Sequence, residues 1–526
     1  MKRRICTLVL CLLACATAGI AQTTFEAADI HASAGTSGIR LPFINSEMRG
    51  GYNRAGRYEL HNATLTDLIA TAWGVETDKV TGGPAWMDTD QFEVVAKAPV
   101  DASPEQIRLM LQALLEERFK LTVHKDQKPF PQYALTAGKH PLLKESAGGE
   151  SGCQSPPQNA QNSASDPIAV MNMVCHNTTM AQLASRLPRN YSQATPVVDL
   201  TGLKGSWDFS LKWTQRSQLA AAGAEGISIF DAVEKQLGLK LEVQMVPMPV
   251  ILVDGANRRP TDNLPGVSKS LPPIPVQFEV ADIKPSAPGS DQKSFRLMPG
   301  GRLDLRGFTL KDLIKLAWEI ADLDVIDNDD MLVGATKGLD ATRFDIVAAV
   351  SSAGPQYRLD TDSARLLLRA LLADRFQLTT HTEDRPVSAY AMVAVKPKLR
   401  RADPSSRPGC RNAPARSGYV PIFQLHCQST TMAQLAEKLP AFGGLYVNHP
   451  VFDATGLEGA WDFDLSWSPP HLIRGGGETG AGAADPNGGL TIVEALDRQL
   501  GLKLVPQKHP MPVLVIDRVE LKPTDN

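Results

Sequence analysis

The sequence has little excess charge, few aromatic residues and, after its N-terminus, no long apolar run. Its 526 residues carry a formal net charge of -3, and 6% of them are aromatic. A polyanion-binding protein needs a basic face and a single-strand binder needs stacking rings, so we expect no nucleic-acid partner. No later stretch approaches the roughly 20 apolar residues of a membrane helix, so we expect no transmembrane span in the mature chain.

The short motifs that mark common catalytic sites are also missing. The sequence contains no HExxH, GxSxG, P-loop or dinucleotide fingerprint. We therefore assign no catalytic, cofactor-binding or metal-binding residue and expect no cofactor. These absences favour a non-enzymatic binding protein, and the alternative is an unrecognised extracellular hydrolase that acts on a polymer.

The first residues have the pattern of a secretory signal. Lys2, Arg3 and Arg4 precede an apolar run, and small residues follow it up to "GIAQ". Cleavage after Ala21 predicts a signal peptide at residues 1–21 and a secreted or periplasmic protein. A bacterial lipoprotein signal, with Cys15 as the lipid-anchored residue, is the alternative.

The rest of the chain consists of two copies of one sequence unit. "FEAADI" at Phe25 returns as "FEVADI" at Phe278, "TTMAQLA" occurs unchanged at 178–184 and 430–436, and "QLGLKL" occurs at 236–241 and 499–504. Both halves close on "PTDN", at 260–263 and 523–526. The order of the phrases is the same and the period is far longer than a solenoid repeat, so the pattern indicates a tandem duplication of a complete domain.

A stretch rich in proline, glycine and polar residues separates the two copies. It reads "GANRRPTDNLPGVSKSLPPIPV" and covers residues 255–276. We predict a first domain at 22–254, a linker at 255–276 and a second domain at 277–526.

Each copy carries both helix and strand patterns. Thr64, Thr179 and Ser228 begin helices with an acid or amide three residues on, Ser103 begins another before Pro104, and copy two repeats three of these starts at Thr309, Thr431 and Thr491. "FEVVAKA" and "WDFSLKW" are typical of strands, and "FKLTVH" and "YALTAG" are expected to flank a turn. The predicted fold class is α+β, with two tandem homologous domains built of small helix-on-sheet modules.

Four of the seven cysteines lie outside the signal sequence, two in each copy. Cys153 and Cys175 fall in copy one, and Cys410 and Cys427 fall in copy two. One pair per copy in a secreted chain predicts one disulfide per copy. The alternative is a zinc site that uses Cys175 with His176, or His426 with Cys427.

As a set, the phrases "FEVADIKPS", "PGGRLDLRGFTLKDLI", "LLADRFQL" and "VFDATGLEGAWDFDL" resemble a family of secreted acidobacterial proteins that is known only as a domain of unknown function (number 3738). The resemblance covers both copies nearly end to end, and it implies no activity. Some relatives join the domain to a membrane sensor peptidase, which implies a role in envelope sensing or recognition. A looser resemblance to the small periplasmic domains of secretins and TonB-dependent receptors implies contact with an envelope protein or extracellular ligand.

A few polar residues recur in both copies and deserve testing as sites. His124 and His381 follow the "RF" strand, Arg118 and Arg375 stand at helix ends where a cation is favourable, and Asp208 and Asp462 lie on a predicted strand. Asp199 and Asp453 would be the second carboxylates of a glycosidase-like pair, although their "DLTGL" and "DATGL" settings are typical of turns. The tryptophans of both copies are expected in the core.

Overall fold

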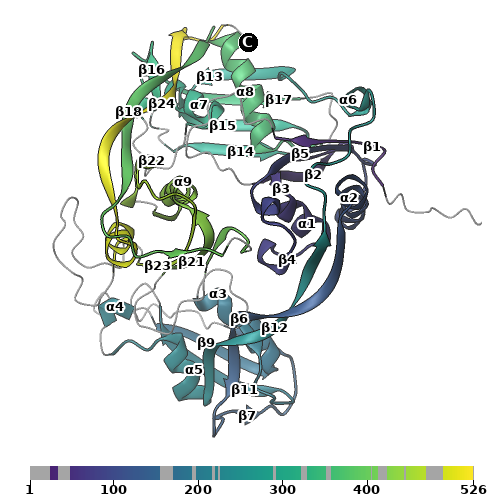
Figure 1. Cartoon of the computed structure of the whole chain (residues 1–526), viewed down its shortest axis with the longest axis vertical. Coiled ribbons are helices and arrows are strands. Elements are labelled where there is room, and N and C mark those ends of the chain that lie inside the picture. Colours follow the sequence, from purple (N-terminus) through teal and green to yellow (C-terminus); the bar gives the residue numbers. More distant parts are fainter. Residues whose placement is uncertain are drawn as a thin grey trace, which may run out of the picture. The chain divides into compact units, whose positions relative to one another are not determined.

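The computed structural model describes residues 24–33, 48–154, 170–191, 197–215, 219–222, 225–287, 289, 292–320, 329–350, 357–403, 406–412, 423–443, 446–468 and 490–524. The predicted signal peptide, with Cys15 and Ala21, lies outside these ranges. Each copy contains two helix-on-sheet modules, here called proximal and distal, which are joined by a long two-stranded ribbon (Figure 1). The α+β fold class predicted from the sequence is therefore confirmed.

The proximal module of copy one is a four-stranded antiparallel sheet with two helices. The strand order is β1-β5-β3-β2, and both helices contribute side chains to one core with the sheet. The elements are β1 (Ala27–Ala32), β2 (Arg49–Arg54), β3 (Arg57–Thr64), α1 (Leu65–Trp73), β4 (Val80–Gly82), β5 (Gln91–Lys97) and α2 (Pro104–Phe119).

The distal module of copy one repeats this plan. Its strand order, β7-β11-β9-β8, places the elements in the same succession as in the proximal sheet. The elements are β7 (Lys144–Glu145), β8 (Gly152–Gln154), β9 (Val170–Thr178), α3 (Met180–Tyr191), β10 (Val197–Asp199), β11 (Trp207–Thr214), α4 (Leu219–Ala222) and α5 (Ile229–Leu237).

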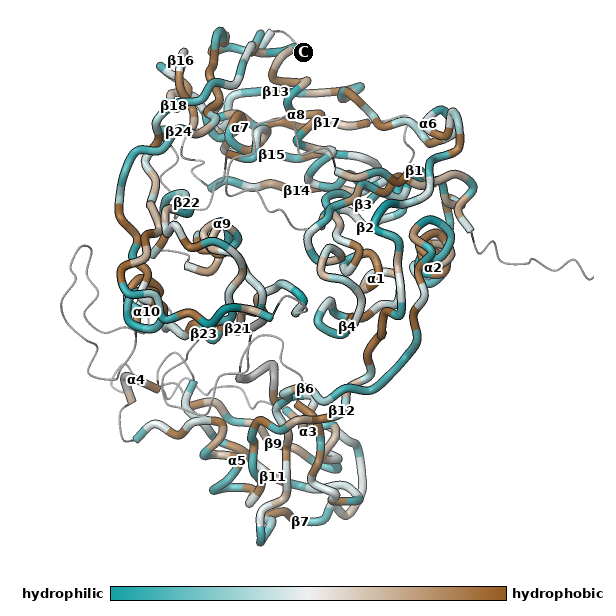
Figure 2. Tube along the Cα trace, in the orientation of Figure 1, coloured by the Kyte–Doolittle hydropathy of each residue, from teal (hydrophilic) through white to brown (hydrophobic). Residues whose placement is uncertain are grey.

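The ribbon of copy one consists of β6 (Thr122–Ala137) and β12 (Leu239–Gly255). The predicted turn between "FKLTVH" and "YALTAG" is wrong, because residues 122–124 of the first phrase and 133–137 of the second lie in the single strand β6. The middle of β6 is hydrophilic (Figure 2) and contains Pro129 and Pro131, which suggested a turn. Both prolines lie on the exposed face of this stretch, with Phe130 buried between them, and proline is accepted where a strand makes few ladder bonds.

Short strands attach each module to the ribbon. β4 pairs in parallel with β12, and β10 pairs in parallel with β6, in the order β10-β6-β12-β4. β6 begins in the proximal module and ends beside β10 of the distal module. β12 begins in the distal module and ends beside β4 of the proximal module, so each module pairs with the ribbon strand that begins in the other.

Copy two has the same three sheets in the same strand order: β13-β17-β15-β14, β16-β24-β18-β22 and β19-β23-β21-β20. After the short helix α6 (Val267–Ser270), its elements are β13 (Val280–Pro285), β14 (Ser294–Met298), β15 (Arg302–Thr309), α7 (Leu310–Ala317), β16 (Leu332–Gly334), β17 (Arg343–Ala349), α8 (Thr361–Arg375), β18 (Thr379–Ala394), β19 (Arg400–Arg401), β20 (Gly409–Asn412), β21 (Phe423–Thr431), α9 (Met432–Gly443), β22 (Val451–Asp453), β23 (Ala460–Trp467), α10 (Ile492–Ala495) and β24 (Leu502–Arg518).

The compact units of the chain do not follow the repeat. One unit holds residues 1–125, 250–389 and 508–526, and the other holds 126–249 and 390–507. The first therefore contains both proximal modules and the second both distal modules, with each division inside a ribbon. The boundaries at 22–254, 255–276 and 277–526 describe the repeat in the sequence, and they remain predictions.

The helix starts predicted from the sequence are confirmed. Thr64, Ser103, Thr309 and Thr491 each form a capping box, in which the side chain accepts from the third helical amide and that residue's side chain accepts from the cap amide. Thr179 and Thr431 make the same reciprocal pair of bonds with Gln182 and Gln434. Each cap contributes about 1 kcal/mol, so these residues fix where the helices begin.

The helices bury one face against the sheets, as their apolar stripes predicted. Leu111 and Leu115 of α2 and Leu367 and Leu372 of α8 are fully buried in their proximal cores. Trp213 and Trp467 are buried in the distal cores, whereas Trp73, Trp207, Trp318 and Trp461 pack against the cores and are partly buried. The expectation that the tryptophans serve the core is confirmed for these six.

Candidate functional site

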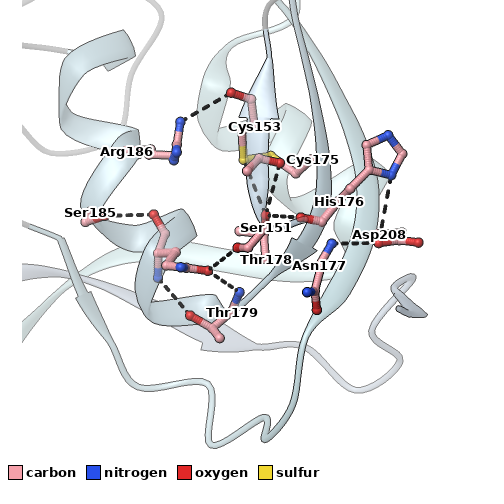
Figure 3. The surroundings of a disulfide bond; sticks show 12 residues. Ser151, Cys153, Cys175, His176, Asn177, Thr178, Thr179, Ser185, Arg186 and Asp208 are labelled. Carbon is pink, nitrogen blue, oxygen red and sulfur yellow. Dashed lines mark hydrogen bonds and ion pairs between the residues drawn. A yellow bond between two sulfur atoms is a disulfide. The ribbon is translucent and has the colours of Figure 1, made fainter. Parts of the chain in front are cut away.

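The two predicted disulfides are present in the distal modules. Cys153 on β8 lies directly opposite Cys175 on β9, and Cys410 on β20 lies opposite Cys427 on β21. Each bond fastens a short outer strand to its sheet, and the bonded pair in copy one is drawn in Figure 3. His176 and His426, the histidines of the alternative zinc site, lie beside Asp208 and Asp464 instead.

Asp208, the first glycosidase-like candidate, holds a β-bulge. Its carboxylate accepts from the amide of Asn177 at 2.8 Å, and Asn177 has a positive φ of 43° (Figure 3). That amide bond, followed by a bond from Ser146, lowers the pKa of Asp208. In copy two, Asp462 accepts from the amide of Ser429 at 2.9 Å in the same way.

The same carboxylate-to-bulge contact occurs in the proximal modules, where sequence reasoning did not find it. Glu93 accepts from the amide of Asn62 at 3.1 Å, and Asp345 accepts from that of Gly307 at 3.1 Å. The register shifts at equivalent points, between Leu60 and Ala63, Leu305 and Phe308, Cys175 and Thr178, and Cys427 and Thr430. In all four modules the bulge stands two residues before the threonine that caps the next helix. These acids therefore shape the strand-to-helix turn.

Glu93 has two further partners. His61 Nδ1 lies 2.6 Å from one oxygen, and Ser33 donates to the other at 2.6 Å. Burial alone would raise the pKa of Glu93, but the bonds from His61, Ser33 and Asn62 lower it to about 2, and the bond to Glu93 raises the pKa of His61. Ser33 contacts the acid rather than the histidine, so this trio does not activate a serine nucleophile. Arg306 and Ser286 surround Asp345 in the same manner.

The remaining candidates also have structural partners. His124 contacts Asp254 and His381 contacts Asp517, each at 2.8 Å across a ribbon and each about half exposed. Asp199 and Asp453 accept from Thr201 and Thr455 in tight turns, as their settings predicted. No second carboxylate facing Asp208 or Asp462 is found among the contacts of the described residues.

Arg118 explains the repeated "PTDN" ending. Its guanidinium, 6% exposed, donates to the carbonyl and hydroxyl oxygens of Thr261 and to Asn263 Oδ1. Asn263 in turn bonds to Asp29 and to the backbone of Ile30 on β1. In copy two, Arg375 donates to the carbonyl of Thr524, whose amide donates back to the carbonyl of Arg375. Each arginine lies at a helix end, as expected, and also bonds to the "PTDN" segment of its copy. These bonds, here called the clasp, hold that segment against the proximal module.

A cluster of Ser388, Lys508 and Asp330 brings a hydroxyl and an amine together. Lys508 Nζ lies 2.8 Å from Asp330 Oδ2 and 3.0 Å from Ser388 Oγ. A serine–lysine pair needs a neutral amine as its base, whereas the bond from Lys508 lowers the pKa of Asp330 and keeps an anion beside the amine. The cluster is therefore an exposed ion pair rather than a catalytic dyad.

Within the proximal unit, charged side chains join copy one to copy two. Arg54, which is 6% exposed, contacts Glu59 on its own hairpin and Asp360 and Ser363 at the start of α8. Arg49 contacts Asp362 at 2.9 Å and Glu319, just after α7, at 3.2 Å. Sequence reasoning missed this contact, because residues 270 or more positions apart were matched only as repeats.

Over the ranges that the structure covers, no cluster of three or more His, Cys, Asp or Glu side chains is arranged to hold a metal ion. None of the helices there has the length and apolar character needed to span a bilayer.

Comparison with known proteins gives one family. The sequence profile of a protein of unknown function (DUF3738) matches residues 66–256 and again residues 311–519. The two matches fall in the two copies, and each runs from the first helix of the proximal module to the end of the ribbon. No curated protein and no solved structure matches the chain. Two tandem copies of this domain make up most of the sequence, and the chain belongs to the DUF3738 family.

Proposed function

We propose that the protein is a secreted or periplasmic, non-enzymatic binding protein that contacts an envelope protein or an extracellular ligand, in a recognition or sensing role. One observation carries this proposal: the polar residues that recur in both copies are engaged in bulges, turns, ribbon pairs and clasps. Asp208 and Asp462 in particular each direct a carboxylate at a backbone amide. A hydrolase would instead bring such groups together around a substrate.

The outer strands support binding as the mode of action. Tyr52 on β2 and Met298 on β14 are exposed apolar side chains, and both strands lie at sheet edges. An edge strand has unpaired backbone groups on one side, and a partner in extended conformation can add to it while its side chains contact the apolar residues. The disulfides are consistent with an oxidising compartment outside the cytoplasm.

The test is affinity capture from a native envelope extract with the full mature chain, followed by mass spectrometry. We expect a reproducible partner whose recovery falls when Met298→Lys places a charge on the edge of β14. Leu109→Lys is the matched control, because Leu109 is similarly exposed but lies on α2. Equal recovery with both variants would contradict binding at this edge.

The hydrolase alternative has its own test. The purified chain is incubated with libraries of peptides, esters and glycans, and we expect no turnover above that of a heat-denatured sample. Turnover that disappears on Asp208→Asn or on His124→Ala, with the fold intact by circular dichroism, would overturn the non-enzymatic proposal.

A further inference from the structure

The contact between the two proximal modules is head-to-tail. Copy one contributes its β2–β3 hairpin through Arg49 and Arg54, whereas copy two contributes the end of α7 and the start of α8. A head-to-tail contact between like domains leaves the opposite face of each outside that contact. Here these two faces, called unused in this sense, are the β14–β15 hairpin and the α1–α2 end. In principle those two faces could join one chain to the next.

The hairpin residues that make the contact are replaced on the unused hairpin. Arg49 pairs with His61 across β2–β3, and Ser294 holds the corresponding place opposite Arg306 on β14–β15. Arg54 pairs with Arg57 next to the hairpin turn, and Met298 stands opposite Arg302 at that point in copy two. The unused hairpin therefore lacks both guanidinium groups that reach the other copy.

The helix-end residues that make the contact are replaced as well. Glu319 follows Trp318 after α7, and Gly74 follows Trp73 after α1. Asp360 is the N-cap of α8, and the N-cap of α2 is Ser103. Only the acid in the first turn is kept, as Asp362 in copy two and Glu105 in copy one. Two of the three carboxylates are thus missing from the unused helix end.

We infer that these charges form a partner-selecting surface: the hairpin of copy one recognises the helix ends of copy two, and the substitutions at the two unused faces stop the contact from joining further chains. The partner is the second copy in the same chain. The tether favours it, because a linked partner is present at an effective concentration in the millimolar range. A charged contact of this kind is specific when the competing faces lack the matching charges. The inference does not rest on the binding function proposed above.

The equivalent residues of the two copies supply the variants for the test. Glu319→Gly with Asp360→Ser gives copy two the helix end of copy one, and both residues are already accommodated by the same fold at Gly74 and Ser103. Hydrogen exchange in the full mature chain should then show faster exchange in residues 49–57 and 357–365, by roughly tenfold or more, because the buried Arg54 loses a partner. Unchanged protection of both segments would overturn the contact.

A second variant moves the acids to the unused face. Glu319→Gly and Asp360→Ser are combined with Gly74→Glu and Ser103→Asp, so that only the α1–α2 end of copy one carries the acids. If the contact stays head-to-tail, the hairpin of copy one then finds these acids only on another chain. Sedimentation velocity should show assembly that grows with concentration for this variant and one species of constant mass for the wild type. A monomeric variant, or a wild type that self-associates, would contradict the inference.

Discussion

The proximal modules of copy one and copy two share their interior and differ at their surface. Both have the same strand order, the same bulge before the first helix and the same threonine cap. The surface residues Arg49 and Glu319 have no charged equivalent in the other copy, where Ser294 and Gly74 stand. Agreement between the copies thus marks what the fold requires, and disagreement marks where the two modules contact different partners.

A parallel difference separates proximal from distal modules. The strand pair that carries Cys153 and Cys175 in a distal module carries Gly50 and Leu60 in the proximal module of copy one. β2 is longer than β8 and is held by the contact with copy two, whereas β8 is three residues long and has the disulfide. Of these two equivalent outer strands, the shorter one therefore carries the covalent bond.

The largest expected effect comes from removing a disulfide. Cys153→Ser with Cys175→Ser should destabilise the distal module of copy one by about 3 kcal/mol in the chain-entropy model, and the matching pair in copy two should lose nearly as much, since loop length enters only logarithmically. Urea unfolding followed by hydrogen exchange reports each module separately. The stability of the proximal modules should be unaffected. An equal loss of stability in all four modules would contradict the difference between proximal and distal modules.

The clasp should give the next largest effect. Arg118→Ala removes several hydrogen bonds from a buried guanidinium and should cost about 2–3 kcal/mol in copy one. Arg375→Ala should likewise destabilise copy two, because its guanidinium donates to the carbonyl of Thr524. The measurement is the urea midpoint of exchange in peptides from β1 and α2, with Arg186→Ala as an exposed control. An unchanged midpoint in either variant would contradict a stabilising role of these bonds.

Helix caps should contribute equally in the two copies. Thr64→Ala and Thr309→Ala each delete a capping box and should each cost about 1 kcal/mol. Thermal unfolding of single variants against Thr→Ser controls, which keep the cap oxygen, measures the difference. A loss confined to one copy would show that the boxes are not equivalent in solution.

The smallest expected effect is a dependence on pH in copy one alone. The pKa of His61 is raised in the folded state, so the stability it adds is fully present below its unfolded pKa and is lost as pH rises through the folded pKa. Arg306 fills the equivalent place beside Asp345 and keeps its charge across this range. Exchange rates in β3 should rise from pH 6 to 8 more than those in β15. His61→Arg should abolish this excess, and its persistence in that variant would exclude His61 as the cause.

Local signals were readable from the sequence because they depend on neighbours in the chain. The helix starts at Thr64 and Ser103 need only residues three positions apart. The cysteine pairs followed from their number in each copy. The ribbons were missed because a hydrophilic strand with two prolines resembles a turn when its pairing partner, more than one hundred residues away, is unknown.

Contacts between residues far apart in the chain could not be predicted from the sequence. "PTDN" was recognised as a repeat, but nothing local pairs Thr261 with Arg118. Asp208 was considered as a catalyst because its bulge partner lies on another strand. One signal was available: "HNAT" at 61–64 and "HNTT" at 176–179 share the residues around the bulge, and they relate the proximal to the distal module.

The most direct test of the central claim concerns the four bulge amides, those of Asn62, Asn177, Gly307 and Ser429. Their hydrogen exchange is measured in the full chain and in variants that replace Glu93, Asp208, Asp345 or Asp462 by alanine, one at a time. If the repeated acids hold the fold, each replacement should release its own bulge amide and leave the other three protected. Free exchange of these amides in the wild type, or protection that survives the replacements, would contradict the account.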